Sequence, residues 1–143
     1  MENGELYPAT KLAKYPHFFP LDIPIWERFI DAYGSRYDGF SYDVKVGTGT
    51  EPIEGVTGEY ARMQAVLSKY RIDAVGFTSD AVTIFEVKPE AGTIAIGQIE
   101  LYTRLYSRDF NPTLPIIGAI VTDRELPDIR EYSEGKGVQY FIV

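Results

Sequence analysis

Three residues that together could bind a metal ion and act on a phosphate lie in one short stretch of the chain. Asp73 stands in the first of two apolar segments, and Glu86 and Lys88 stand in the second. The segments are expected to form a hairpin with Ser79 and Asp80 as its two-residue turn. In that register Asp73 lies directly opposite Glu86, and Lys88 points to the same face two residues later.

Two facing carboxylates predict a site for a divalent cation. Side chains that face each other across an antiparallel pair are about 5 Å apart. Carboxylates at that distance repel, and a buried charge is unfavourable unless it is paired or bound to a metal. Oxygen ligands and the absence of cysteine favour Mg²⁺ or Mn²⁺ over zinc. The alternative is an ordinary ion pair at a sheet surface, although the flanking residues are apolar on both faces.

A second group of candidate residues lies on the helix expected after the hairpin. Gln98 and Tyr102 are four residues apart, so they share one helix face. An acidic residue two positions before a lysine occurs three times, at 43–45, 86–88 and 134–136. Only the middle copy has an acidic residue at the matching register of the preceding strand and a Gln–Tyr pair on the following helix. The alternative is that Gln98 is a surface residue and Tyr102 a core residue.

This combination resembles the PD-(D/E)xK nuclease superfamily, and the segment 97–102 resembles the Gln-x-x-x-Tyr motif of its RecB-like and phage exonuclease branches. Judged by element order, the resemblance covers roughly residues 22–122. It implies a restriction-endonuclease-like α/β core and metal-dependent cleavage of DNA. The chain differs from the pattern at Ile72, where proline is usual before Asp73. His17 lies in the N-terminal arm, so no upstream histidine clearly matches the one in RecB-type sites.

The resemblance also implies roles for the acidic residues and the lysine. Asp73, Glu86 and the backbone carbonyl of Val87 would ligate one or two Mg²⁺ or Mn²⁺ ions. Lys88 would orient or deprotonate the attacking water and stabilise the pentacovalent phosphate. On physical grounds, a lysine beside two carboxylates acts first as an electrostatic stabiliser. Glu27, on the first helix, matches an acid that some members place beside the metal; the alternative is a solvated helix residue.

The remaining candidates would handle the nucleic acid. In the family, Gln98 and Tyr102 would position its backbone or the waters on the metal. Lys69 and Arg71 share the parity of Asp73 if their strand is regular, so they would lie on the reactive face. Together with Arg104 they are candidate substrate-binding residues. The alternative for these cations is ordinary surface charge, with Arg104 paired within its own helix.

The rest of the chain supplies elements that would position these residues. Asp22 is expected to cap the first helix, which has an apolar stripe and ends before Gly34. Segment 60–67 is ambiguous between a helix and the start of a long strand. Helices are expected at 22–33, 94–107 and 127–134. Strands are expected at 40–46, 71–77, 81–87, 115–122 and 138–143. The expected fold class is α/β, with a mixed central sheet flanked by helices in αβββαβ order.

Length and composition indicate a single domain over residues 1–143, which the resemblance implies is nuclease-like. It has an arm rich in aromatic residues and proline at 1–20 and a glycine-rich loop at 47–58. No apolar run reaches membrane-spanning length and the start is acidic, so a soluble cytoplasmic protein is expected. The net charge of −7 argues against a generic nucleic-acid coat, because phosphate binding usually needs a basic surface. This charge is compatible with an enzyme whose bound metal ions contact the phosphate.

The expected function is metal-dependent hydrolysis of phosphodiester bonds in DNA, with RNA left open as the substrate, of the kind used in phage or mobile-element DNA processing. With no room for a separate recognition domain, specificity would come from loops, from a homo-oligomer or from a protein partner. Two alternatives stay open. One is a catalytically silent nuclease-like domain that binds nucleic acid or has a structural or regulatory role, in a phage complex for example. The other is a metal-dependent hydrolase of small phosphate esters.

Overall fold

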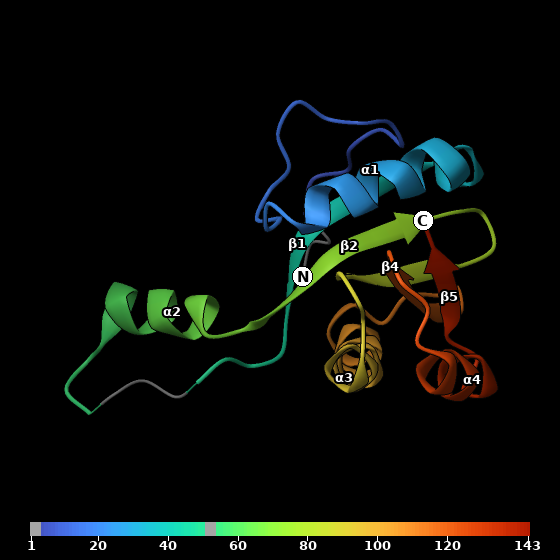
Figure 1. The fold of residues 1–143 in the computed structure, drawn as a ribbon. Coiled ribbons are helices and arrows are strands. Elements are labelled where there is room, and N and C mark those ends of the chain that lie inside the picture. The colour runs from blue at the N-terminus through green and yellow to red at the C-terminus, as the bar shows by residue number, and fades with distance from the viewer. Residues whose placement is uncertain (1–3, 51–53) are drawn as a thin grey trace.

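A five-stranded mixed sheet forms the middle layer of the protein, as Figure 1 shows. The computed structural model describes residues 4–50 and 54–143. The strands are β1 (Gly39–Val46), β2 (Tyr70–Phe77), β3 (Val82–Val87), β4 (Ile116–Thr122) and β5 (Gln139–Ile142). They lie side by side in chain order, so β3 is the central strand. β1, β2 and β3 form an antiparallel meander, and the β3–β4 and β4–β5 pairs are parallel.

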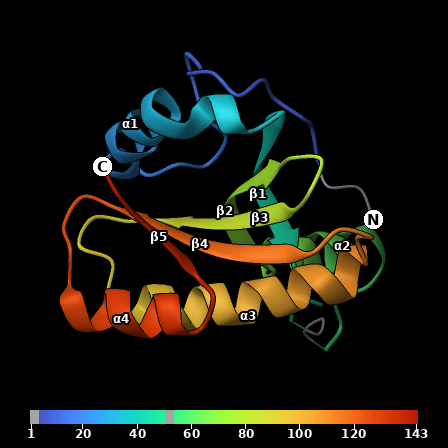
Figure 2. The same cartoon turned by 90° about the vertical axis from the view of Figure 1, so that its right-hand side faces the viewer.

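Helices cover both faces of this sheet (Figure 2). The helices are α1 (Asp22–Tyr33), α2 (Gly58–Leu67), α3 (Thr93–Phe110) and α4 (Pro127–Gly135), with a 3-10 turn at Gly34–Arg36. α1 lies on one face of the sheet, and α3 and α4 lie on the other. α2 extends away from the sheet and has no buried residue. The predicted α/β class, with a mixed sheet flanked by helices, is therefore confirmed. None of the described helices is both long and apolar enough to cross a lipid bilayer.

α1 forms over the sheet because apolar residues recur along one of its faces. Ile25, Trp26, Phe29 and Ile30 follow the helical spacing and are all buried. The rings of Trp26 and Phe29 are stacked 5.0 Å apart, and each meets Phe85 of β3 edge to face. Such pairs contribute about 0.5–1.5 kcal/mol each beyond their buried area. The aromatic cluster therefore fixes α1 directly over the central strand.

The expectation that Asp22 caps α1 is wrong. The helix begins at Asp22 itself, Leu21 holds the cap position, and no side-chain hydrogen bond caps the helix. Asp22 lies three residues before Ile25 and four before Trp26, so its side chain shares their helix face. It is only 8% exposed. The carboxylate is therefore turned toward the sheet with the apolar stripe instead of back to the amides of its own helix.

α3 packs closely on the opposite face of the sheet, and this places residues 98 and 102. Ala95, Ile99 and Tyr106 of α3 are buried against the strands. A Cβ added at Gly118 of β4 would lie 2.6 Å from Cγ2 of Ile99. That distance is far below the roughly 3.5–4.0 Å at which carbon atoms make contact. Glycine at this position therefore allows the helix to approach β4.

The hairpin formed by β2 and β3 has the predicted register. Ala74 pairs with Phe85 and Phe77 pairs with Val82. Backbone N of Thr78 donates to the carbonyl of Ala81 at 3.1 Å across the turn. Both strands are inner strands, because β1 flanks β2 and β4 flanks β3. The apolar flanks of the two acidic segments therefore indicated their central position correctly.

The other elements differ from expectation mainly in their ends. The ambiguous segment 60–67 is helical and belongs to α2, and β2 begins only at Tyr70. The expected helix at 94–107 runs from 93 to 110 as α3. The described part of the N-terminal arm packs Tyr15 and Phe18 against the aromatic cluster on the α1 side. Residues 1–3 of the expected arm and 51–53 of the expected loop lie outside the described residues.

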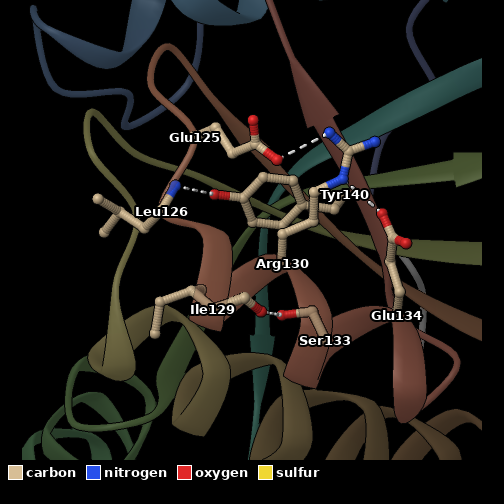
Figure 3. A network of polar contacts seen from close by, with 7 residues as sticks. All are labelled: Glu125, Leu126, Ile129, Arg130, Ser133, Glu134 and Tyr140. Carbon is tan, nitrogen blue, oxygen red and sulfur yellow. Dashed lines mark hydrogen bonds and ion pairs between the residues drawn. The ribbon is translucent and has the colours of Figure 1, made fainter.

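Polar contacts link α4 to the loop before it and the start of α4 to β5, as Figure 3 shows. The guanidinium of Arg130 forms ion pairs with Glu125 at 3.1 Å and Glu134 at 2.7 Å. Backbone N of Leu126 donates to the hydroxyl of Tyr140 on β5 at 3.3 Å. The charged groups are largely exposed, and exposed ion pairs contribute only about 0–1 kcal/mol each. This network orients α4, and none of its residues belongs to the candidate site.

Candidate active site

One cavity brings together most of the residues that the sequence indicated. It has a volume of about 330 Å³ and lies between the start of β2, the end of β3, the start of α1 and the first half of α3. The candidate catalytic and metal-binding residues that line it are Asp73, Glu86, Val87, Lys88, Gln98 and Tyr102. Two of the candidate substrate-binding residues, Lys69 and Arg71, line it as well. Residues that the sequence did not indicate complete the lining: His17, Phe19, Asp22 and Tyr70.

β2 and β3 stop pairing at the acidic residues, beside the cavity. The last residue pair of their ladder is Ala74 and Phe85, so the ladder stops one position short of Asp73 and Glu86. Beyond that point a side chain replaces the backbone acceptor, since the N–H of Val87 donates to Oδ2 of Asp73 at 2.9 Å. This hydrogen bond fixes the orientation of the Asp73 carboxylate. The two acidic residues therefore stand where the antiparallel ladder gives way to side-chain contacts.

The backbone of Val87 faces the same region. The next amide, the N–H of Lys88, donates to the carbonyl of Val121 on β4 at 3.1 Å. Neighbouring residues of a strand direct their amide groups to opposite sides, so the N–H and C=O of Val87 both point toward β2. No residue of β2 pairs with Val87 in the ladder. Its carbonyl oxygen thus lies on the side of the Asp73 carboxylate, where the metal-ligand role was expected.

Burial and mutual repulsion disfavour the charged forms of the two acids. Glu86 is only 5% exposed. Burial, followed by repulsion from Asp73, raises the pKa of Glu86 to about 9. Burial also raises the pKa of Asp73 to about 7, although the hydrogen bond from Val87 opposes that change. In so close a pair the titration belongs to both groups together. A divalent cation beside them would replace this repulsion by attraction.

Lys88 brings a positive charge to the same place. Its ammonium opposes the burial that raises the pKa of Asp22, Asp73 and Glu86. The three acids come from α1, β2 and β3, so Lys88 is within electrostatic reach of all three elements. Within residues 4–50 and 54–143, none of the salt bridges involves Lys88. Its charge therefore acts on the acid cluster as a whole and is not paired with one carboxylate.

Gln98 and Tyr102 reach the cavity from successive turns of α3. Burial raises the pKa of Tyr102, a hydrogen bond with Gln98 opposes this, and the nearby Glu86 and Asp73 raise it further. The buried Oε1 of Gln98 has no hydrogen-bond partner among the described residues. Such an unmet acceptor is unfavourable by about 1–3 kcal/mol. This amide oxygen therefore marks a position for a water or a substrate group that donates a hydrogen bond.

The acid that α1 contributes to the cavity is Asp22, and Glu27 lies elsewhere. Glu27 does not line the cavity, and its Oε2 accepts a hydrogen bond from the hydroxyl of Tyr15 at 3.3 Å. Asp22 lines the cavity and raises the pKa of both Asp73 and Glu86. Position on the helix explains the difference, because Asp22 belongs to the buried face of α1 and Glu27 does not. The geometry gives no support to the metal role expected for Glu27.

The basic candidates divide in the same way. Lys69 and Arg71 line the cavity, as their shared parity with Asp73 predicted, whereas Arg104 is an exposed residue of α3 outside it. Nη1 of Arg71 lies 2.8 Å from Nδ1 and 2.9 Å from Nε2 of His17. The N-terminal arm is thereby joined to β2, and His17 becomes a lining residue. No periodicity in the arm could have indicated this contact.

A further acid on β1 stands behind the cavity. The β1–β2 register places Asp43 opposite Asp73, but the two do not pair, and Asp43 has a φ of 52°. Oδ1 of Asp43 is 3.5 Å from Nε of Arg71, and Oδ2 is 3.5 Å from Nζ of Lys45. Asp43 does not line the cavity but raises the pKa of Asp73. Acidic residues therefore stand at one level across three neighbouring strands.

The donor set fits Mg²⁺ or Mn²⁺ better than a metal that needs a complete protein cage. Within the described residues, no three His, Asp or Glu side chains are grouped so that they could hold a metal ion by themselves. Structural zinc sites require four protein ligands, whereas Mg²⁺ is usually held by one or two carboxylates, waters and substrate phosphate. Asp73 and Glu86, with the carbonyl of Val87, offer such a partial shell. The unmet Oε1 of Gln98 could accept from a water in it.

A larger but shallow hollow of about 460 Å³ runs along α4. It is lined by Asp128, Glu131, Tyr132, Gly135 and Lys136, and all five residues are exposed. Charged side chains on an exposed surface are the ordinary case in a folded protein and do not by themselves indicate a site. The smaller cavity is therefore the better candidate for chemistry, because only there do buried acids converge.

The raised pKa values of the acid pair predict how stability depends on pH. In the unfolded chain both carboxyls ionise near about pH 4. Above that pH the native pair holds more protons than the unfolded chain, so the free energy of unfolding should fall as the pH rises toward about 9. Mn²⁺ binds the ionised carboxylates, so it should raise the melting temperature more at about pH 8.5 than at about pH 6. Thermal unfolding followed by circular dichroism measures both effects. A metal-free stability that rises between these pH values would contradict the raised pKa values.

Comparison with protein families, with characterised proteins and with solved structures found no significant match to this chain.

Proposed function

We propose that this protein is a metal-dependent nuclease that hydrolyses phosphodiester bonds in DNA, built on a restriction-endonuclease-like core. The observation that carries the proposal is the convergence of Asp73, Glu86 and Lys88 in one cavity, with Gln98 and Tyr102 facing them from α3. The order α1, β1, β2, β3, α3, β4 supports the same core, with α2 inserted between β1 and β2. An acid pair in a structural role would be unfavourable, because burial and repulsion raise both pKa values.

The chain's own residues have distinct tasks in this reaction. Asp73, Glu86 and the carbonyl of Val87 would hold Mg²⁺ or Mn²⁺, which lowers the pKa of a bound water and draws charge from the phosphate. The hydrogen bond from Val87 keeps the Asp73 carboxylate oriented for that task. Lys88 would place its ammonium beside the developing negative charge on phosphate oxygens.

The α3 side chains would position the reacting groups. The unmet Oε1 of Gln98 would accept a hydrogen bond from the attacking water and so fix the direction of its lone pair. Tyr102, held between Gln98 and Tyr70, would bond a phosphate oxygen through its hydroxyl. Lys69, just before β2, and Arg71, on β2, line the cavity and would bind neighbouring phosphates of the DNA strand.

A cleavage assay tests the proposal directly. Purified protein is incubated with linear duplex, circular duplex and single-stranded DNA, each with Mg²⁺, Mn²⁺ or EDTA. We expect products only with a metal ion, and the comparison of linear with circular DNA reports whether an end is required. A model phosphodiester and a nucleotide serve as small substrates in parallel. Cleavage of the small substrates alone would replace the proposal by a phosphate-ester hydrolase, and no cleavage of any substrate would refute it.

The placement of Asp22 gives a separate prediction. Asp22→Asn should weaken Mn²⁺ binding and slow cleavage by about tenfold or more, because it removes a charge that acts on the acid pair. Glu27→Gln makes the same change in charge on the same helix outside the cavity, and it should leave both quantities within about twofold of wild type. Titration calorimetry with Mn²⁺ and cleavage rates measure the contrast. A larger effect from Glu27→Gln would reverse the assignment.

A further inference from the structure

Two exposed aromatic rings stand at the entrance of the cavity. Phe19 is 66% exposed and Tyr70 is 50% exposed, yet both line the cavity that contains Asp73 and Glu86. Most of the surface of the Phe19 side chain is therefore open to water. Flat rings beside a site for phosphate chemistry offer faces on which nucleic-acid bases stack, at about 1–3 kcal/mol per base.

The two rings are held in place by the fold. The carbonyl of Phe19 accepts hydrogen bonds from backbone N of Asp22 at 2.9 Å and of Ile23 at 3.3 Å, so this residue is tied to the start of α1. Its ring centre is 5.9 Å from that of His17. The ring of Tyr70 lies 5.7 Å from that of Tyr102. Each exposed ring is therefore supported by an adjacent ring and by an element that also supplies a cavity residue.

The size and charge of the site favour a single strand over a duplex. A volume of about 330 Å³ is near the lower end of the range for small-ligand sites, about 300–1,000 Å³, so it suits one nucleotide and not a base pair with two backbones. Duplex DNA has a high charge density, and its binding depends on many cationic contacts. This chain has a net charge of −7. Stacking does not require a basic surface, and Lys69 and Arg71 suffice for adjacent phosphates.

We propose that the cavity takes an unpaired nucleotide whose base stacks on Phe19 or Tyr70, so the substrate is single-stranded DNA or the frayed end of a duplex. The identity of the bond that is cut rests on the proposed function. Binding of the strand through the two rings is a separate property, because it requires neither a metal ion nor catalysis.

Equilibrium binding in EDTA tests the inference without cleavage. A fluorescein-labelled thymidine oligonucleotide and a duplex of equal length are titrated with protein and followed by fluorescence anisotropy. We expect the strand to bind at least about tenfold more tightly than the duplex. Leucine in place of the ring that carries the base, tested as Phe19→Leu and as Tyr70→Leu, should weaken binding of the strand by about 5- to 150-fold, which is the conversion of 1–3 kcal/mol. Both side chains are exposed, so the melting temperature should stay close to that of wild type.

Tyr60→Leu is the matched control. Tyr60 is an aromatic residue of α2 with 77% exposure and does not line the cavity, so its replacement should leave strand binding within about twofold. Equal binding of strand and duplex would overturn the inference, as would a lack of strand binding or wild-type affinity in both ring variants. A protein that binds the strand through the rings but cuts no DNA with Mg²⁺ or Mn²⁺ would refute the proposed function alone. Equal cutting of strand and duplex without ring dependence would refute the inference alone.

Discussion

Glu86→Gln should abolish metal-dependent cleavage while making the metal-free protein more stable at about pH 8. The loss of a charged metal ligand should reduce the rate by at least about a thousandfold, which corresponds to about 4 kcal/mol of transition-state stabilisation. The gain in stability follows because the amide is neutral. It carries no charge for burial and the repulsion from Asp73 to disfavour, and these two effects raise the pKa of Glu86. We expect an increase in the free energy of unfolding of about 1 kcal/mol or more. Cleavage rates and urea denaturation with EDTA provide the two measurements.

The control for this variant is Asp80→Asn in the turn of the same hairpin. Asp80 is exposed, so the same change in charge should leave cleavage and stability near wild type. If Glu86→Gln instead lowered metal-free stability by about 3–5 kcal/mol, the size typical of a broken buried ion pair, the acid pair would be structural. That outcome would restore the ordinary cross-strand ion pair as the explanation of these charges.

Lys88→Met should slow cleavage by about a hundredfold to a thousandfold and leave Mn²⁺ binding within about threefold of wild type. The reason is that Lys88 forms no salt bridge with a described residue and acts on the acids only at longer range. Its ammonium is therefore free to stabilise charge that develops on the phosphate. Single-turnover rates and titration calorimetry separate the chemical step from metal binding.

Lys136→Met, at the exposed C-cap position directly after α4, is the matched control and should leave the rate unchanged. Unchanged cleavage by Lys88→Met would remove the catalytic role of this lysine. A loss of Mn²⁺ binding as large as the loss of rate would show that Lys88 acts by organising the acids. The two measurements together therefore distinguish a catalytic lysine from a positioning one.

The central part of the site could be predicted because it depends on local pairing. A two-residue turn sets the register of the β2–β3 hairpin, and that register alone brings Asp73 and Glu86 together. Helical spacing similarly puts Gln98 and Tyr102 on one face of α3. The alternation of side chains along β2 was enough to associate Arg71 with the acids, whereas Lys69 lines the cavity from the position just before the strand.

The contributions of α1 and the arm depend on tertiary packing and were missed or misassigned. Asp22 looked like a cap, but its spacing of three and four residues from Ile25 and Trp26 extends the buried stripe. That signal could have identified Asp22 in place of Glu27. His17 gave no such signal, because it reaches Arg71 through an irregular segment in which its own φ is 53°.

The acid on β1 was hidden for a different reason. Asp43 faces Asp73 only once β1 and β2 are paired, and the connection between these strands contains α2 and a long loop. No tight turn sets that register, so the sequence could place the segment 43–45 in a strand but could not align it with β2. Long-range pairing of this kind follows from the packing of the whole sheet.

The most direct test of the account is an anomalous-scattering map from crystals soaked in Mn²⁺. We expect a peak in the cavity within coordination distance of carboxylate oxygens of Asp73 and Glu86 and of the carbonyl oxygen of Val87. Soaked crystals of Glu86→Gln should show the peak weakened or absent. A cavity without a manganese peak, or acid side chains that point away from each other, would contradict the metal-dependent site.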